Sequence, residues 1–293
     1  MKLPEQPLYR IISLESFLSL LLESKTHFVR PTSWEDTFEG CSLRYALDRN
    51  KYSVLVDRLN SIFKESDNCI DAILTNFASA ESVCLYSFGQ CWSVVKDSDA
   101  MWRIYSYGKM AIQIESSYDD ILKAISKDEY VKNSEIVCRI VEYDVKKEEK
   151  ESGFESFCSR GKPIIEPFFH KRKAFEHEKE VRILISDGKL NSYYHKKLNN
   201  YRRELKNYSD RGISNSEVAT SVISKVNSRE DFRALQKMTE EENALDISVD
   251  LRQYIKGVRV HPQAKEWYRD VIKDLCNKFE VPFYGQSDLY EEA

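Results

Sequence analysis

The chain lacks the patterns that identify most metal-binding, disulfide-linked and secreted proteins. Seven cysteines are scattered over 293 residues without a CxxC pair, and the five histidines show no metal-ligand spacing. An odd number of dispersed cysteines is typical of reduced thiols in a cytosolic protein. The N-terminus has no signal-peptide apolar core, and the apolar run 14–22 is too short to cross a bilayer. We therefore expect a soluble, cytoplasmic protein with no membrane partner.

A dominant charge and the common nucleotide or hydrolase motifs are also missing. The net charge is −4, so the overall composition does not indicate nucleic acid or an anionic membrane as the partner. The chain has no GxGxxG, no P-loop and no GxSxG. Hydrophobic residues make up 42% and aromatic residues 12%, which is enough to fill a core. Any function must therefore come from a local group of residues in a folded chain.

Alternating and helical spacings are mixed along the chain, which predicts an α+β fold. We expect one domain over residues 1–293, with mixed, largely antiparallel sheets and flanking helices. The expected strands are 8–12, 27–29, 83–88, 110–114, 135–145, 175–185 and 254–260. The expected helices are 14–22, 44–79 with a turn near 66–68, 97–105, 167–175 and 264–279. The polar segment 188–245 has helical spacing and predicts a mostly helical insertion, not a second core.

The segment 175–185 carries the most informative pattern. Read as a strand, its alternate side chains face opposite ways. One face then carries Val181, Ile183 and Ile185. The other carries Glu176, Glu178, Glu180 and Arg182. Three carboxylates and a guanidinium beside a buried face are costly unless they line a wet cleft or bind a ligand. The alternative is a solvated strand face with an Arg–Glu pair.

Several short motifs occur in a fixed order and together resemble a bacterial family of unknown function that is often found beside phage-defence genes. They are Leu8-Tyr9-Arg10, Arg30-Pro31 with Trp34-Glu35-Asp36 and Phe38-Glu39, Ser87-Phe88 with Cys91-Trp92, Met101-Trp102 with Tyr105, and Glu178-Lys179-Glu180-Val181-Arg182. The resemblance covers most of 8–185 and resumes at 258–289. The insertion 188–245 departs from the shorter pattern of that family, so its role is open.

A Tyr-Arg pair on a first strand, a mid-chain serine on a second and a late Glu-x-Glu on a third also resemble the R–S–E arrangement of ADP-ribosyltransferases. The resemblance implies an ADP-ribosyltransferase-like fold with NAD as the substrate. It makes Glu180 the catalytic carboxylate that binds the ribose, and Glu178 its partner on the acceptor side. The residues implied to bind NAD are Arg10, Ser87, Trp102 and Tyr105.

The chemistry of NAD cleavage explains these residue types. Breaking the nicotinamide–ribose bond creates an oxocarbenium-like centre, which a carboxylate stabilises more strongly as the positive charge develops. A guanidinium can hold phosphates bidentately, and aromatic rings stack on nicotinamide or adenine. The chain is then expected to be an NAD-consuming effector in bacterial antiviral defence or a toxin. Its acceptor would be a nucleic acid or a protein, and the sequence leaves room for a regulatory partner.

Two other functions stay open. Asp36 and Glu39, brought near Glu178 and Glu180, could form a Mg²⁺ site for a nuclease effector, although turn formation and helix capping also explain the first two. In a catalytically silent sensor or binding module, Glu178 and Glu180 would instead form a structural ion-pair network with Arg10 and Arg182. The remaining candidates have structural alternatives as well: an edge-strand ion pair for Arg10, a backbone contact for Ser87 and a core position for Trp102.

Overall fold

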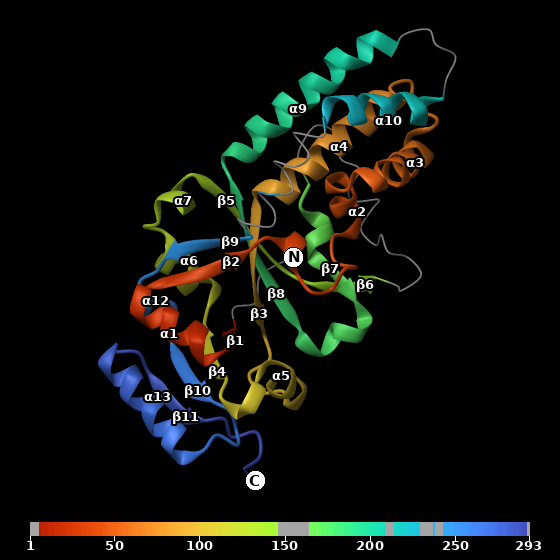
Figure 1. Cartoon of the computed structure of the whole chain (residues 1–293). Coiled ribbons are helices and arrows are strands. Elements are labelled where there is room, and N and C mark those ends of the chain that lie inside the picture. The colour runs from red at the N-terminus through yellow and green to blue at the C-terminus, as the bar shows by residue number, and fades with distance from the viewer. Residues whose placement is uncertain (1–5, 146–163, 209–213, 229–236, 238–242, 292–293) are drawn as a thin grey trace.

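A mixed nine-stranded sheet forms the framework of the computed structural model, which describes residues 6–145, 164–208, 214–228, 237 and 243–291 (Figure 1). The strand order is β11-β10-β4-β1-β3-β2-β9, and β8 pairs with both β3 and β5. All of these pairs are antiparallel except β10 with β11. The strands are β1 Leu8–Ile12, β2 Lys25–Val29, β3 Ser87–Ser93, β4 Ile112–Ser116, β5 Ser134–Ile140, β8 Glu180–Asp187, β9 Ala244–Ser248, β10 Gly257–Val260 and β11 Phe283–Gln286.

A second, two-stranded parallel sheet joins β6 Glu142–Val145 to β7 His170–Arg172. The helices are α1 Leu14–Glu23, α2 Cys41–Arg44, α3 Tyr52–Phe63, α4 Cys69–Tyr86, α5 Asp99–Tyr105, α6 Tyr118–Ile125, α7 Glu129–Lys132, α9 Lys189–Leu205, α10 Asn215–Val226, α12 Leu251–Tyr254 and α13 Glu266–Lys278. Serine side chains at positions 13, 98 and 214 cap three of them by accepting a backbone N–H three residues later. The predicted class, α+β with a mixed sheet and flanking helices, is confirmed.

Buried side chains form two hydrophobic clusters. One lies around the sheet and includes Phe17, Ile114, Val181, Ile183 and Ile272. The other lies within a helical arm of α3, α4, α9 and α10, which Figure 1 shows side by side at one end of the molecule, opposite α13. Helix α4 runs directly into β3 and β8 runs into α9, so the arm extends from two paired strands.

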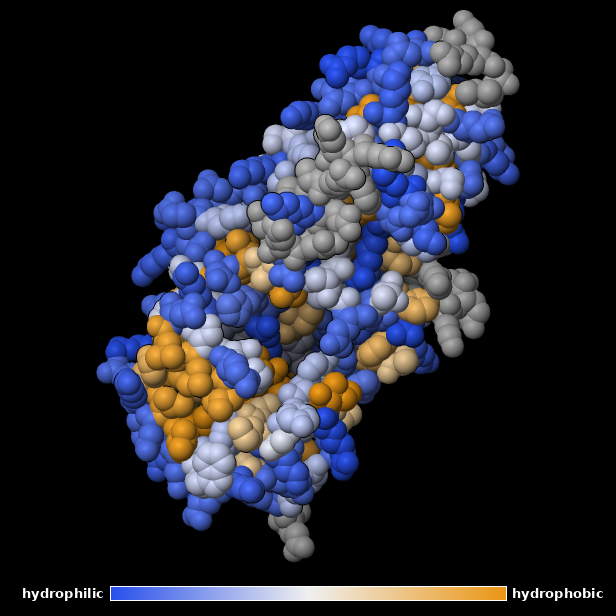
Figure 2. Space-filling model, in the orientation of Figure 1, coloured by the Kyte–Doolittle hydropathy of each residue, from blue (hydrophilic) through white to orange (hydrophobic). Residues whose placement is uncertain are grey.

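Segment 188–245 was predicted to be an insertion without a core of its own. The helical arm shows a second core to which this segment contributes. Helices α9 and α10 are there, as expected, but their apolar faces complete the second cluster against α3 and α4. The buried side chains of α9 include Leu190, Tyr194, Leu198 and Tyr201, which recur at helical spacing. Their polar neighbours obscured this pattern, and Figure 2 shows the arm as mostly hydrophilic on the face in view.

Some predicted boundaries were wrong for identifiable reasons. The expected strand 83–88 is mostly helix, because α4 continues to Tyr86. The last turns of α4 are buried on every side, so their sequence does not show the alternation of apolar and polar residues that marks a helix with one exposed face. The expected strand 175–185 begins only at Glu180: residues Lys173–Glu178 form a 3₁₀ turn (η6), and Lys179 has a left-handed backbone with φ of 42°. The expected helix 167–175 is interrupted by β7, the strand 135–145 is split into β5 and β6, and 254–260 becomes a strand only at Gly257.

None of the described helices combines the length and apolar character that a bilayer crossing requires.

Candidate functional site

A cavity of about 660 Å³ lies on the face of the sheet formed by β1, β3 and β8. The loop 33–39, helix α5 and the β7–η6 segment supply its other walls. Its aromatic lining comprises Tyr9, Trp34, Trp92, Tyr105 and Phe175. A cavity of this volume is in the range that binds small ligands and cofactors.

Arg10 enters this cavity from the middle of β1, where it is paired with Ile114 of β4. No ion pair joins its guanidinium to a carboxylate in the part of the chain that the structure describes. A buried hydrogen-bond chain lies beside it: Trp92 Nε1 donates to Gln90 Oε1 at 2.8 Å, and the Tyr254 hydroxyl donates to the same oxygen at 2.9 Å. Burial raises the pKa of Tyr254, and the charge of Arg10 and its hydrogen bond to that hydroxyl oppose the rise. Arg10 is therefore held in place by neutral groups, which leave its charge available.

A buried cluster of charged side chains lies across the cavity from Arg10. Lys171 Nζ lies 2.6 Å from Glu178 Oε2, 3.2 Å from Glu39 Oε1 and 3.3 Å from Glu180 Oε2. Arg182 donates from Nε to Glu180 Oε1 at 2.8 Å and from Nη2 to Glu180 Oε2 at 2.9 Å. A third bond runs from Arg182 Nη2 to Glu39 Oε2 at 2.7 Å. Three carboxylates thus contact two cations, which leaves one negative charge in excess if all are ionised.

The pKa values of the two carboxyl groups that bind Arg182 are shifted in opposite directions. Burial acts to raise the pKa of Glu180, but the charge and hydrogen bonds of Arg182, together with Lys171, outweigh it and lower that pKa from 4.5 to about 2. Burial also raises the pKa of Glu39, and there Arg182 and Lys171 do not compensate for it. Because Glu180 receives the bidentate pair and Glu39 a single bond from Arg182, the charged form is stabilised more strongly at Glu180 than at Glu39. Glu180 is then the fixed anion of the site.

Tyrosine hydroxyls complete the surroundings of the two glutamates on the cavity wall. Tyr105 donates to Glu178 Oε1 at 3.2 Å, while the residue as a whole is 45% exposed. The backbone N–H of Glu180 donates to the Tyr143 hydroxyl at 2.7 Å. Cys91 lies beside Glu180, and burial raises the pKa of its thiol well above the usual value, which disfavours a nucleophilic thiolate.

The structure brings together four of the six residues predicted for the site: Arg10, Tyr105, Glu178 and Glu180. Val181, Ile183 and Ile185 are fully buried on the other face of β8, as the alternation predicted. Glu178 was predicted to lie on the same strand as Glu180, but it is the last residue of η6 and lies outside the strand. The pair reaches the same cavity because both side chains contact Lys171.

Ser87 and Trp102 lie outside the cavity. Ser87 is at the opposite end of β3 from Ser93, and its hydroxyl lies 3.2 Å from that of Ser186 in a buried position. Trp102 is fully buried and packs edge-on against His261, with ring centroids 5.4 Å apart. Helix α5 presents positions 101 and 105, four residues apart, to the cavity, so the intervening Trp102 faces inward.

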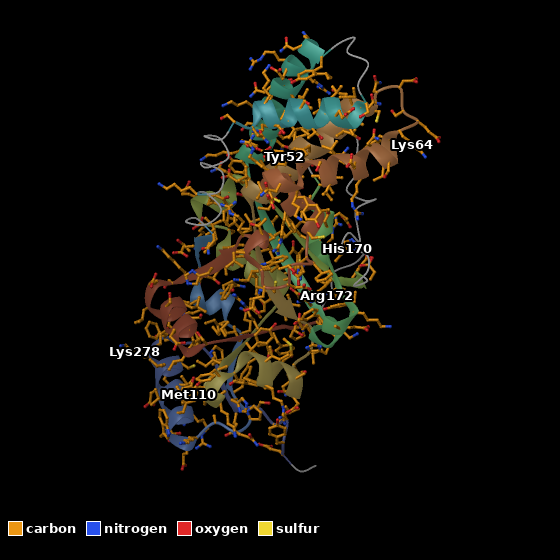
Figure 3. All side chains as sticks on the ribbon, turned by 45° about the vertical axis from the view of Figure 1, so that its right-hand side comes forward. Tyr52, Lys64, Met110, His170, Arg172 and Lys278 are labelled. Atoms are coloured by element: carbon orange, nitrogen blue, oxygen red, sulfur yellow. The ribbon has the colours of Figure 1, made fainter. Side chains whose placement is uncertain are left out.

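The central cation, Lys171, was missed because its segment was expected to be helical. The only signal in the sequence was the three-residue run His170-Lys171-Arg172, which is too short to reveal an alternating strand. Figure 3 labels His170 and Arg172, the two ends of this strand. Arg172 binds Asp36 bidentately, at 3.1 and 3.0 Å.

These contacts do not favour the predicted magnesium site. Asp36 is occupied by Arg172, and the carboxylates of Glu39, Glu178 and Glu180 are occupied by Lys171 and Arg182. Within the described ranges, the one group of three side chains with metal-ligand spacing lies elsewhere, at Glu142, Asp144 and His170.

No protein-family model, no curated protein and no solved structure matches this chain. The resemblance to a defence-associated family therefore stays a prediction.

Proposed function

We propose that this chain binds NAD in the cavity and cleaves its nicotinamide–ribose bond, as an ADP-ribosyltransferase-like enzyme. The observation that carries the proposal is the convergence of Arg10 from the first strand with Glu178 and Glu180 on one cavity of about 660 Å³. Arg10 has no carboxylate partner among the described residues, and Glu180 is a fixed anion in the same cavity. These two groups match the two ends of the chemistry, a pyrophosphate and a developing oxocarbenium centre.

Arg10 would bind the pyrophosphate. No ion pair with a residue that the structure describes has to be broken first, so the attraction between guanidinium and phosphate is available. The Tyr254 hydroxyl, which donates to Gln90, also contacts Arg10, and this neutral partner orients Arg10 without neutralising its charge. Trp34 and Tyr105 line the same space and offer faces on which a base or nicotinamide can stack.

Glu180 would stabilise the transition state. Its carboxylate is ionised at neutral pH, because Arg182 and Lys171 outweigh the effect of burial on its pKa. A carboxylate offers about four lone-pair sites; Arg182 and Lys171 use three of those on Glu180 and the Cys91 thiol uses the fourth, so a ribose hydroxyl would displace this weak thiol donor. Glu178, bonded to Tyr105 and Lys171, lies beside it and would orient the acceptor.

The acceptor is proposed to be a nucleic acid or a protein, and the setting to be bacterial antiviral defence or toxin action in the cytoplasm. Both follow from the resemblance of the ordered motifs. The basic, tyrosine-containing helix α9 supports nucleic acid slightly over protein, since its last turn carries Arg202 and Arg203.

The test is nicotinamide release from NAD⁺, measured with and without RNA, DNA or cell lysate. We expect release by the wild type and a loss of about 10²–10³-fold in Glu180→Gln, the size seen when one group that stabilises a transition-state charge is removed. Arg10→Gln is the sharper variant, because Arg10 is half-buried and the described part of the chain gives it no ion pair whose loss would unfold the protein. Glu135→Gln, at an exposed position of β5, is the matched control.

The rival functions give different results. Wild-type protein that releases no nicotinamide under any of these conditions refutes the proposal. Magnesium-dependent cleavage of nucleic acid without NAD turnover supports the nuclease. If Glu180→Gln changes only the stability, and no activity appears in any sample, the charged cluster belongs to a binding module.

A further inference from the structure

The small parallel sheet β6–β7 has two faces with different chemistry. On one face, Tyr143 accepts the Glu180 N–H and Lys171 contacts the carboxylates of the cavity. Side chains alternate along a strand, so the residues that flank Tyr143 and precede Lys171 point the other way. Those residues are Glu142, Asp144 and His170.

The second face brings a histidine and two carboxylates within metal-binding range. Ligand atoms of Glu142, Asp144 and His170 all lie within 4.8 Å of one another. His170 Nδ1 is 2.9 Å from Asp144 Oδ1, and Glu142 is paired in register with His170. The imidazole keeps only 10% of its surface exposed and the Asp144 side chain 48%, so the histidine lies beneath carboxylates that a solvent ion can reach.

We propose that Glu142, Asp144 and His170 bind a divalent transition-metal ion, for which Zn²⁺ is the probe. Zinc binds imidazole nitrogen and carboxylate oxygen at about 2.0–2.2 Å, so two of its ligand atoms lie roughly 3–3.5 Å apart. The 2.9 Å between His170 and Asp144 is close to this spacing, and Glu142 lies within 4.8 Å of both. Two carboxylates match the double charge of the ion, and three protein ligands leave one position for water. The imidazole favours such a metal over Mg²⁺, which prefers oxygen ligands in octahedral geometry.

A metal ion bound here would affect the cavity from the opposite face of the β6–β7 sheet. It would join β6 to β7 through side chains, in addition to their backbone pairing. Because Tyr143 and Lys171 are the neighbours of the ligands on the opposite face, the same ion would hold them against Glu180 and Glu178. The ion itself takes no part in the proposed reaction, so this inference stands independently of NAD cleavage.

The experiment is calorimetric titration of the chelator-treated full chain with ZnCl₂, and separately with MgCl₂. We expect one equivalent of Zn²⁺ to bind and Mg²⁺ to bind far more weakly. His170→Ala and Glu142→Gln should each weaken Zn²⁺ binding at least about 10–100-fold, the loss caused by removing even an outer-shell partner. Glu142 is exposed, so its variant tests the site even if His170→Ala fails to fold.

The chain provides a matched control in a second His–Asp pair. His27 Nδ1 lies 2.5 Å from Asp246 Oδ1, but the described residues bring no third ligand to them. His27→Ala should bind Zn²⁺ as the wild type does. The proposal is overturned if the wild type does not bind Zn²⁺, if Mg²⁺ binds equally well, or if His170→Ala and Glu142→Gln keep wild-type affinity.

Discussion

Acid should destabilise this protein through Glu180, and a single substitution should remove much of that sensitivity. Glu180 is 4% exposed and its pKa falls from 4.5 to about 2 on folding, because Arg182 and Lys171 outweigh the effect of burial. A depressed carboxyl pKa means that the unfolded chain binds the proton more tightly. The contribution to stability is therefore complete above the unfolded pKa and is lost as the pH falls from about 5 to about 2.

The size of this contribution follows from the two pKa values. The difference between 4.5 and about 2 corresponds to about 3 kcal/mol of folding free energy. Glu39 acts in the opposite sense, because burial raises its pKa, and its contribution is lost as the pH rises above the ordinary carboxyl value. The two effects occupy different pH ranges, so of these two carboxyl groups only Glu180 contributes to the slope below pH 4.

The assay is urea unfolding followed by tryptophan fluorescence at pH 7, 5 and 3. Glu180→Gln should be less stable than the wild type by about 3–5 kcal/mol at pH 7, since it leaves Arg182 buried with one partner fewer. Between pH 5 and 3 the variant should lose less stability than the wild type, by about 1–2 kcal/mol. Glu135→Gln should follow the wild type throughout. If Glu180→Gln shows the wild-type dependence on pH, the assignment of Glu180 as a fixed anion is refuted.

Two further predictions concern packing around the site and in the arm. At Gly89 a Cβ would lie 2.6 Å from Leu184 Cδ2 and 2.8 Å from Trp34 Cζ2. Gly89→Ala should therefore lower the free energy of unfolding in urea by about 1–3 kcal/mol and shift the tryptophan emission. Unchanged emission and stability would contradict this packing. In the arm, the Tyr201 hydroxyl donates to the buried Glu81 Oε2 at 3.0 Å. Tyr201→Phe should lower the free energy of unfolding by about 1–3 kcal/mol in the same assay. A variant as stable as the wild type would show that this hydrogen bond contributes nothing to stability.

The sequence predicted the apolar side of the site well and its charged side only in part. Val181, Ile183 and Ile185 alternate, and that alternation holds because β8 lies between β3 and β5 in the sheet. Extending the same alternation back to Glu178 failed, because the left-handed Lys179 interrupts the strand, and nothing in the local pattern of charges marks that turn. The conclusion that both carboxylates face one cavity was right although the local structure assigned to Glu178 was wrong.

Three features of the molecule depend on tertiary contacts that the sequence pattern did not predict: the orientation of Trp102, the position of Lys171 and the second core. Trp102 and Tyr105 were both plausible ring-stacking residues, and only the packing of α5 shows that position 102 faces the core. Lys171 joins three carboxylates from separate segments, and no local pattern reports on such a meeting. The second core was missed because α9 is polar overall, although its buried positions recur at helical spacing.

Binding of NAD⁺ to the full chain tests the central claim most directly. In a calorimetric titration we predict one bound equivalent for the wild type and an affinity at least about tenfold lower for Arg10→Gln, the loss expected from one charge-assisted hydrogen-bond pair. Arg269→Gln, on helix α13 and outside the cavity, should bind as the wild type does. Absence of NAD⁺ binding, or equal affinity in Arg10→Gln, would contradict the account.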